Sequence, residues 1–233
     1  MRRAAILALV LLPLLAGGAV AAEAEAEPDP LAGWRFVAAA WLFVPGVHGE
    51  VSADDVRSRV EPGPGAGLVQ RVEAFRGPLG LCGEGAALWW RGAGREGSEA
   101  EGLLTTTDLA GAFRFEGLAD LSLTVEGGLR HLATRVRSEG PAGRGDSGGR
   151  WFAPRLGIAA EAGLGERFTV SLRAAAVLGE GGGPDFSVAA GLRLSETATL
   201  EVGWRRLAID GSSRRLRLDA ALSGPFAGVV FRF

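Results

Sequence analysis

Apolar and polar side chains alternate along most of this 233-residue chain. The stretch DLSLTVEGGLRHL, which begins at Asp120, places Leu121, Leu123, Val125 and Leu129 on one parity. Its serine, threonine, glutamate and arginine lie on the other. From Arg167, the stretch RFTVSLRAAAVL repeats the arrangement. A period of two sustained over about ten residues predicts long β-strands with one apolar and one polar face. The 37 glycines also argue against long helices.

Ten segments share this alternation. Tight turns at Gly77–Pro78, 117–119, 164–166 and Glu196 contrast with wider gaps at 45–65, 92–102 and 135–150, which are predicted to be long polar loops. This is the plan of a bacterial outer-membrane barrel. The sequence therefore predicts an all-β fold over residues 33–233, a transmembrane antiparallel up-and-down β-barrel of about ten strands. The strands are expected at 33–44, 66–76, 79–91, 103–116, 120–134, 151–164, 167–178, 184–195, 197–209 and 214–233.

The last segment changes the parity of its apolar residues between Leu222 and Ala227. We interpret it as one bent strand with a β-bulge near Ser223, Gly224 and Pro225. A barrel of eight strands is the alternative count. The first segment holds aromatic residues on both parities, so the sequence does not indicate which of its faces points outward.

A soluble β-barrel or sandwich with the apolar parity inside would alternate in the same way. Two features of the alternation favour the membrane version. Small residues of the apolar parity, such as Ala38, Gly127 and Ala174, would fill a soluble core poorly but suit a lipid-facing surface. The polar parity carries both signs of charge, which can pair across a narrow lumen. The predicted lumen charge network consists of Arg71, Glu73, Glu84, Asp108, Arg114, Glu126, Arg130, Arg155, Glu161, Arg173, Arg193, Glu201, Arg205 and Arg232.

Aromatic residues gather near the ends of the predicted strands, as they do in the interfacial girdles of membrane barrels. Since the chain contains no tyrosine, tryptophan and phenylalanine fill these positions. The residues concerned are Trp34, Phe36, Trp41, Phe43, Trp89, Trp90, Phe113, Phe115, Trp151, Phe152, Phe168, Trp204, Phe231 and Phe233.

The N-terminal region has the features of an export signal. Arg2 and Arg3 precede an apolar run and a set of small residues, which predicts a secretory signal peptide over residues 1–22. Residues 23–32 are predicted to form an acidic periplasmic leader. The formal net charge of −2 gives no reason to expect a nucleic-acid partner. Cys82, the single cysteine, lies in an alternating run and is predicted to be a packing residue.

The chain ends with GPFAGVVFRF. Near its beginning, in GWRFVAAAWLFVPGVHGEV, an aromatic-rich first strand runs into a Pro-Gly turn. These stretches resemble small, mostly uncharacterised outer-membrane β-barrel proteins of Gram-negative bacteria. The resemblance implies localisation in the cell outer membrane, in contact with its lipid. It also implies that the last strand is the signal read by the barrel assembly machinery, with Val229, Phe231 and Phe233 as its apolar positions. We expect a monomer, although the sequence does not fix the oligomeric state.

Outer-membrane enzymes rely on a histidine base paired with a hydroxyl or an acidic residue, and the chain contains two histidines. A catalytic pair that faces lipid would need a histidine and a serine two positions apart on the same strand face. The residue two positions after His131 is Ala133, which cannot act as the nucleophile. His48 lies near Asp54 and Asp55, which are expected to be solvated loop charges. We expect no catalytic, cofactor-binding or metal site and no cofactor.

The sequence thus favours a non-enzymatic barrel with a charged, largely filled lumen, acting in envelope structure or in surface interactions through the loops 45–65 and 135–150. The filled lumen is favoured because ten strands enclose little space once long side chains point inward. A narrow channel for small solutes or ions is the first alternative. A lipid-modifying or proteolytic outer-membrane enzyme is the second.

Overall fold

The computed structural model describes residues 33–233 except 54–55, 94–98, 119–120, 141–142 and 214–215. The predicted signal peptide and leader therefore lie outside the described residues. Among the described residues, no helix is long and apolar enough to cross a membrane. The strands are β1 (Trp34–Phe43), β2 (Gly46–Ala53), β3 (Val56–Arg76), β4 (Leu79–Ala93), β5 (Glu99–Leu118), β6 (Leu121–Gly140), β7 (Gly143–Leu164), β8 (Phe168–Val177), β9 (Gly183–Arg193), β10 (Ala198–Ser212) and β11 (Leu216–Arg232).

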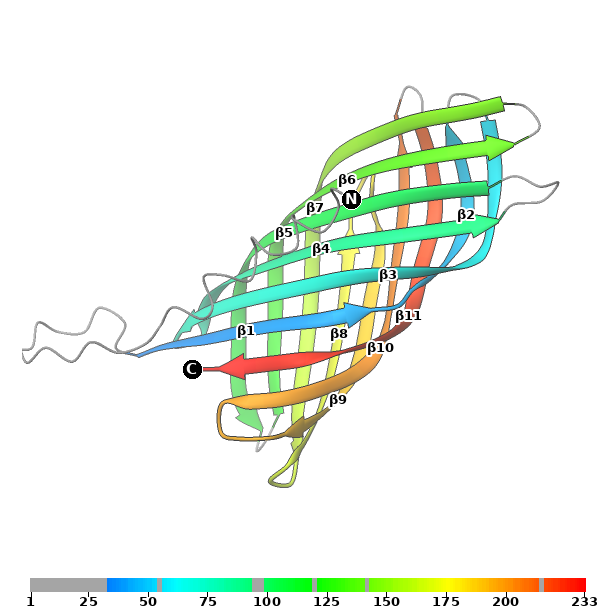
Figure 1. Ribbon diagram of the computed structural model, residues 1–233. Helices are drawn as coiled ribbons and strands as arrows, with labels where there is room; N and C mark the ends of the chain where they lie inside the picture. The colour runs from blue at the N-terminus through cyan, green and yellow to red at the C-terminus, as the bar shows by residue number, and fades with distance from the viewer. Residues whose placement is uncertain (1–32, 54–55, 94–98, 119–120, 141–142, 214–215) are drawn as a thin grey trace, which may run out of the picture. The chain divides into compact units, whose positions relative to one another are not determined.

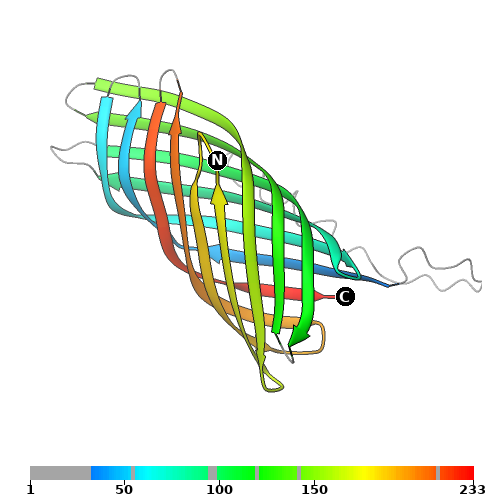
Figure 2. The same ribbon diagram turned by 180° about the vertical axis from the view of Figure 1, so that it is seen from behind.

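These strands form one closed antiparallel sheet (Figures 1 and 2). Each strand from β3 to β11 pairs with its neighbours in chain order, and β1 and β2 both pair with β3 and β11, which closes the ring. β1 and β2 pair with β11 in one continuous register and together occupy one strand position of the barrel wall. Each of the ten strand positions is called a stave. The stave of β1 and β2 is interrupted at Pro45, which lacks a backbone N–H. The predicted barrel of ten strands is confirmed, and the alternative of eight is wrong.

The predicted long loops at 45–65 and 135–150 are wrong. Residues 46–53 and 56–76 form the β2–β3 hairpin, and β6 and β7 pair from Gly140 and Gly143 down to Leu121 and Ala162. The predicted loop at 92–102 likewise shortens, because β4 extends to Ala93 and β5 begins at Glu99. These segments are polar because one face of each strand meets water, which a polarity-based loop prediction cannot distinguish from an irregular connection.

The outward face of one half of the barrel is an apolar band, here called the belt. Every stave contributes side chains to it that the protein itself leaves uncovered. This half of the barrel ends at the connections after β3, β5, β7 and β9, where the first and last residues of the barrel also lie. That end of the barrel is called the turn end. Representative members of the belt, one for each stave, are Leu42, Val72, Leu81, Leu109, Val125, Leu156, Leu172, Val188, Val202 and Phe231.

The opposite half, here called the extension, reverses this polarity. It comprises β2 and the stretches of β3–β7, β10 and β11 farthest from the turn end, and Figure 1 shows these strands continuing well past the β8–β9 hairpin. Its outward side chains are polar or charged, including His48, Glu50, Arg91, Arg135, Arg137, Arg144, Asp146, Arg150, Asp210, Arg217 and Asp219. Its inward side chains are mostly apolar, with Ser138 and Ser147 as buried polar exceptions. The apolar ones include Val47, Val51, Leu88, Trp90, Leu104, Leu132, Val136, Leu207, Ile209, Leu216, Leu218 and Leu222.

The β-bulge predicted near Ser223, Gly224 and Pro225 is absent. β10 and β11 pair without interruption from Ala198–Phe231 to Ser212–Arg217. The apolar parity changes because the surroundings of β11 change: Leu218 and Leu222 point into the extension, whereas Val229 and Phe231 belong to the outward face of the belt half. The register shift of this region lies instead in the β2–β3 pair, between Val47 and Gly49.

The first strand is now oriented. Trp41 and Phe43 are buried inside the barrel, whereas Leu42 on the opposite parity is exposed. Trp34 and Phe36 share the outward parity and stack with their ring centroids 6.1 Å apart. The aromatic residues thus divide into outward and inward sets. The inward residues are Trp41, Phe43, Phe75, Trp90, Trp151 and Phe226.

Candidate functional site

The lumen within the belt half contains a closed ring of alternating charges. Four arginines and four carboxylates contact one another in sequence, and each of these side chains is at most 11% exposed. They project from seven different strands, because the inward parity of every long strand meets the others across a narrow barrel. The ring runs through Arg71, Glu126, Arg155, Asp108, Arg130, Asp185, Arg205 and Glu84 and returns to Arg71.

Two arginines of the ring, Arg130 and Arg205, make bidentate hydrogen bonds to its carboxylates. Arg130 donates from Nε and Nη2 to the two oxygens of Asp108, at 2.7 and 2.6 Å, and from Nη2 to Asp185 at 2.9 Å. Arg205 donates to both oxygens of Asp185 and, at 2.6 Å, to Glu84. Bidentate pairs of this kind fix orientation as well as charge. The contact from Arg205 on β10 to Glu84 on β4 spans the lumen.

The other side of the ring involves Arg71 and Arg155. Arg71 contacts Glu84 and Glu126 and also donates to Glu73 at 2.6 Å. Arg155 donates to Glu126 at 2.7 Å and lies 3.1 Å from Asp108. Each ring carboxylate therefore faces two guanidinium groups, and the eight charges sum to zero.

Glu73 connects the ring to the region nearer the turn end. Besides Arg71, it accepts hydrogen bonds from Arg114 at 2.8 Å and Arg173 at 3.3 Å. Arg114 also lies over the ring of Phe75, 3.9 Å from the centroid, in cation–π geometry. A second level of charge thus lies below the ring.

The remaining predicted network residues lie outside these two levels. Arg232 donates to Glu161 at 2.7 Å as a separate pair, and Glu201 accepts a hydrogen bond from the indole of Trp41 at 3.0 Å. Arg193 was wrongly predicted to join the network. It is exposed at the end of β9 and donates to the backbone oxygen of Glu166 in the β7–β8 connection, because the strand ends before its side chain can reach the lumen.

Asp185 belongs to the ring, and the sequence reasoning missed it. It follows Pro184 near the start of β9, where an aspartate is easily assigned to a turn. Its parity, shared with Ser187, was the available signal. The predicted assembly-signal residues Val229, Phe231 and Phe233 share the outward parity of β11 at the turn end.

An apolar layer fills the lumen beyond the ring. Phe43, Leu88, Leu104 and Leu132 point inward from four strands, and each is about 1% exposed. The backbone of β2 comes within 8 Å of both β6 and β7 across the interior, so the walls of the extension are collapsed onto each other. The inward apolar side chains of the extension, together with Phe43 at the end of β1, are called the plug. Together, the ring and the plug occupy much of the interior with side chains.

Trp151 closes the wall of the extension. β7 pairs with β8 only from Arg155 downward, so its upper part has no strand partner on that side. The indole of Trp151 is 6% exposed and donates to the backbone oxygen of Ser212 on β10 at 2.9 Å. A Cβ atom added at Gly181 would come within 2.6 Å of the Cβ atom of Trp151, so the β8–β9 connection packs tightly beneath it.

A cavity of about 300 Å³ lies on the turn-end side of the ring and is called the vestibule. A smaller cavity of about 40 Å³ lies at the level of the ring, lined by Glu84, Arg155, Asp185 and Arg205 among others. The charged side chains that line the vestibule are Arg35, Arg71, Glu73, Arg114, Glu116, Glu126, Glu161, Arg173, Glu201 and Arg232.

Neither histidine faces the lumen. His131 lies on the outer face of β6 and packs on Phe152, with the rings tilted by 33° and their centroids 4.5 Å apart. His48 is exposed on β2, and Asp54 and Asp55 lie outside the described residues. Within the described ranges, neither imidazole has a hydrogen bond to a hydroxyl or carboxylate side chain, and no cluster of histidine, cysteine and acidic residues could hold a metal ion.

No protein-family model and no curated protein sequence matches the chain. Among solved structures, it is similar to the outer-membrane protease OmpT from Escherichia coli, with 10% identity, 85% of this chain and 97% of that chain covered, and a TM-score of 0.50. It is also similar to Ail, the attachment invasion locus protein of Yersinia pestis (9% identity, 86% and 99% covered, TM-score 0.41). The likeness to OmpT shows that the chain has the outer-membrane β-barrel fold.

Proposed function

We propose that this protein is a closed, non-enzymatic barrel of the Gram-negative outer membrane, which presents the extension at the cell surface. The belt supports the membrane location, because an exposed apolar surface around all ten staves is stable only against lipid. The turn end then faces the periplasm, as the short connections of such barrels do. The polar outside and apolar inside of the extension suit a structure surrounded by water.

The single observation that carries the proposal is the double closure of the lumen. An ion crossing the barrel would have to separate the charges of the ring, each of which is already compensated, and then pass the plug. Removing one ring charge leaves its partners uncompensated in a buried site, which is costly. This favours a role in envelope structure or in contacts through the extension over solute passage.

The last strand has features that suit recognition during insertion into the membrane. Val229, Phe231 and Phe233 lie on the outward parity of β11, and the closure between β11 and β1 continues to hydrogen bonds between Phe36 and Phe233. We assign these three residues to recognition by the barrel assembly machinery, where exposed alternating apolar side chains at the end of the chain would be read before the barrel closes.

The test is the ion current through planar bilayers that contain the mature barrel. We expect no defined current steps from the wild-type protein or from Arg173→Ala, whose side chain lines the vestibule. A heat-dependent mobility shift on the same samples establishes that the barrel has folded and inserted. Steady current steps in the wild type that change size in Arg173→Ala would contradict the closed-barrel proposal and favour a narrow channel.

A further inference from the structure

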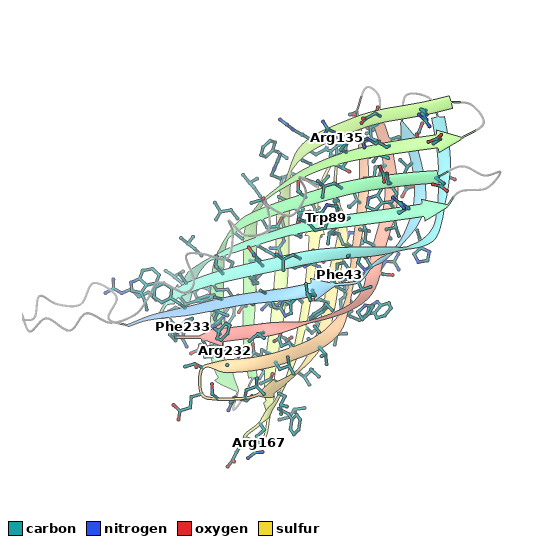
Figure 3. The ribbon with its side chains drawn as sticks, viewed as in Figure 1. Phe43, Trp89, Arg135, Arg167, Arg232 and Phe233 are labelled. Atoms are coloured by element: carbon teal, nitrogen blue, oxygen red, sulfur yellow. The ribbon has the colours of Figure 1, made fainter. Side chains whose placement is uncertain are left out.

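The outer face of the β6–β7 hairpin carries two exposed arginines just beyond the belt. Arg135 on β6 projects away from the barrel wall (Figure 3), and Arg150 on β7 has the same outward orientation. Arg135 is paired with Gly148, and Arg150 with Ala133. The two arginines therefore occupy diagonal positions, with Cβ atoms about 7–8 Å apart. At that spacing, both guanidinium groups can reach the oxygens of one phosphorylated headgroup.

The arginines nearer the tip of the same hairpin are in a different state. Arg137 lies 3.3 Å from Asp146, and Arg144 lies 2.8 Å from Glu139. Within the part of the chain that the structure describes, no acidic side chain lies within ion-pair distance of either arginine beside the belt. The unpaired arginines thus occur where the barrel wall leaves the membrane, and the paired ones occur farther out in water.

Apolar surface continues directly from the two arginines toward the turn end. Phe152, which is 76% exposed, follows Arg150 by two residues and packs against His131. Leu129 and Leu156 extend this surface down the same two strands. The aromatic residue marks the level of lipid headgroups, and the leucines below it lie at the level of acyl chains.

We infer that Arg135 and Arg150 form a binding site for the phosphate of a lipid in the outer leaflet. The inference rests on the membrane placement proposed above. Arginine presents a planar fork of donors that matches phosphate geometry, and neither fork is occupied by a carboxylate. The occupant is a phosphorylated lipid rather than free phosphate, because Phe152 and the leucines offer contacts that only an attached acyl chain can use.

The test measures the retention of single lipids on the folded, full-length mature barrel by native mass spectrometry. The probes are diphosphorylated lipid A, the same lipid with its phosphates removed, and inorganic phosphate alone. We expect Arg135→Ala/Arg150→Ala to weaken binding of the phosphorylated lipid by at least about tenfold. The matched control Arg137→Ala/Arg144→Ala removes the same number of positive charges from the same hairpin and should change binding by less than about twofold.

Three outcomes would overturn the inference: equal weakening in both double variants, equal retention of the dephosphorylated lipid by the wild type, or equally tight binding of inorganic phosphate. Arg135→Lys/Arg150→Lys should retain intermediate affinity, because charge remains while the planar fork is lost. A heat-shift gel on each sample separates the two proposals. A wild-type barrel that does not insert contradicts the membrane placement, whereas one that inserts but binds independently of both arginines contradicts only the lipid site.

Discussion

Glu126 illustrates how the ring depends on single residues. Its carboxylate is buried and lies between Arg71 and Arg155, which come from strands on either side of β6 in the chain. Both arginines lose a partner if this one side chain is shortened. Because both guanidinium groups are buried and neither can give up its proton, the cost falls on the folded state.

We therefore expect Glu126→Ala to lower the free energy of unfolding by about 3–5 kcal/mol. The measurement is equilibrium unfolding in urea of the barrel in lipid vesicles, followed by tryptophan fluorescence. Glu139→Ala is the matched control: it also deprives an arginine of its carboxylate partner, but that pair is exposed, so stability should hardly change. Similar small effects of the two substitutions would mean that the ring contributes little.

The sequence indicates which residues face the lumen but not which of them meet. Parity correctly turns Arg71, Glu84 and Arg130 inward. Their pairing depends on the relative heights of strands far apart in the chain, as in the contact between Arg205 and Glu84, which are 121 residues apart. Arg193 shows a second limit of prediction from parity. Its parity indicates the lumen, but parity does not reveal that its strand ends at the rim of the barrel.

At the scale of the element, β11 runs from the extension into the belt half while its pairing with β10 continues without interruption. Sequence reasoning assumes that each face of a strand meets one solvent along its whole length. It therefore interpreted the change of surroundings along β11 as a β-bulge. The same assumption assigned the outer ends of β6 and β7 to a loop. A strand that leaves the membrane exchanges lipid for water on its outer face, and its hydrophobic pattern shifts by one residue without any bulge.

Two alanines of β11 provide a direct test. Ala227 and Ala221 lie on the same outward parity, one within the belt half and one in the extension. We expect Ala227→Arg to destabilise the barrel by about 2–4 kcal/mol, because the charge would face lipid. Ala221→Arg should stay within about 0.5 kcal/mol of the wild type, because its side chain would face water. Equal costs in urea unfolding would show that both positions share one environment.

At the scale of the whole molecule, the barrel combines two arrangements that the sequence presents as rivals. The belt half is apolar outside and charged inside, whereas the extension is polar outside and apolar inside. The ring holds the staves together where lipid gives no hydrophobic driving force toward the interior, and the plug does so where water surrounds the wall. The ring and the plug are both built from side chains of the barrel strands, so within the described residues the wall itself supplies the groups that occupy the lumen.

The six tryptophans report on this arrangement, since three point outward and three inward. In variants that retain one tryptophan each, lipids brominated on their acyl chains should quench the fluorescence of Trp34, Trp89 and Trp204. The inward residues Trp41, Trp90 and Trp151 should keep their fluorescence, because the barrel wall separates them from lipid. Aqueous iodide provides the complementary control and should also leave the inward set unquenched. Strong quenching of the inward residues by brominated lipid, with the outward ones protected, would invert the wall and contradict the membrane placement of the belt.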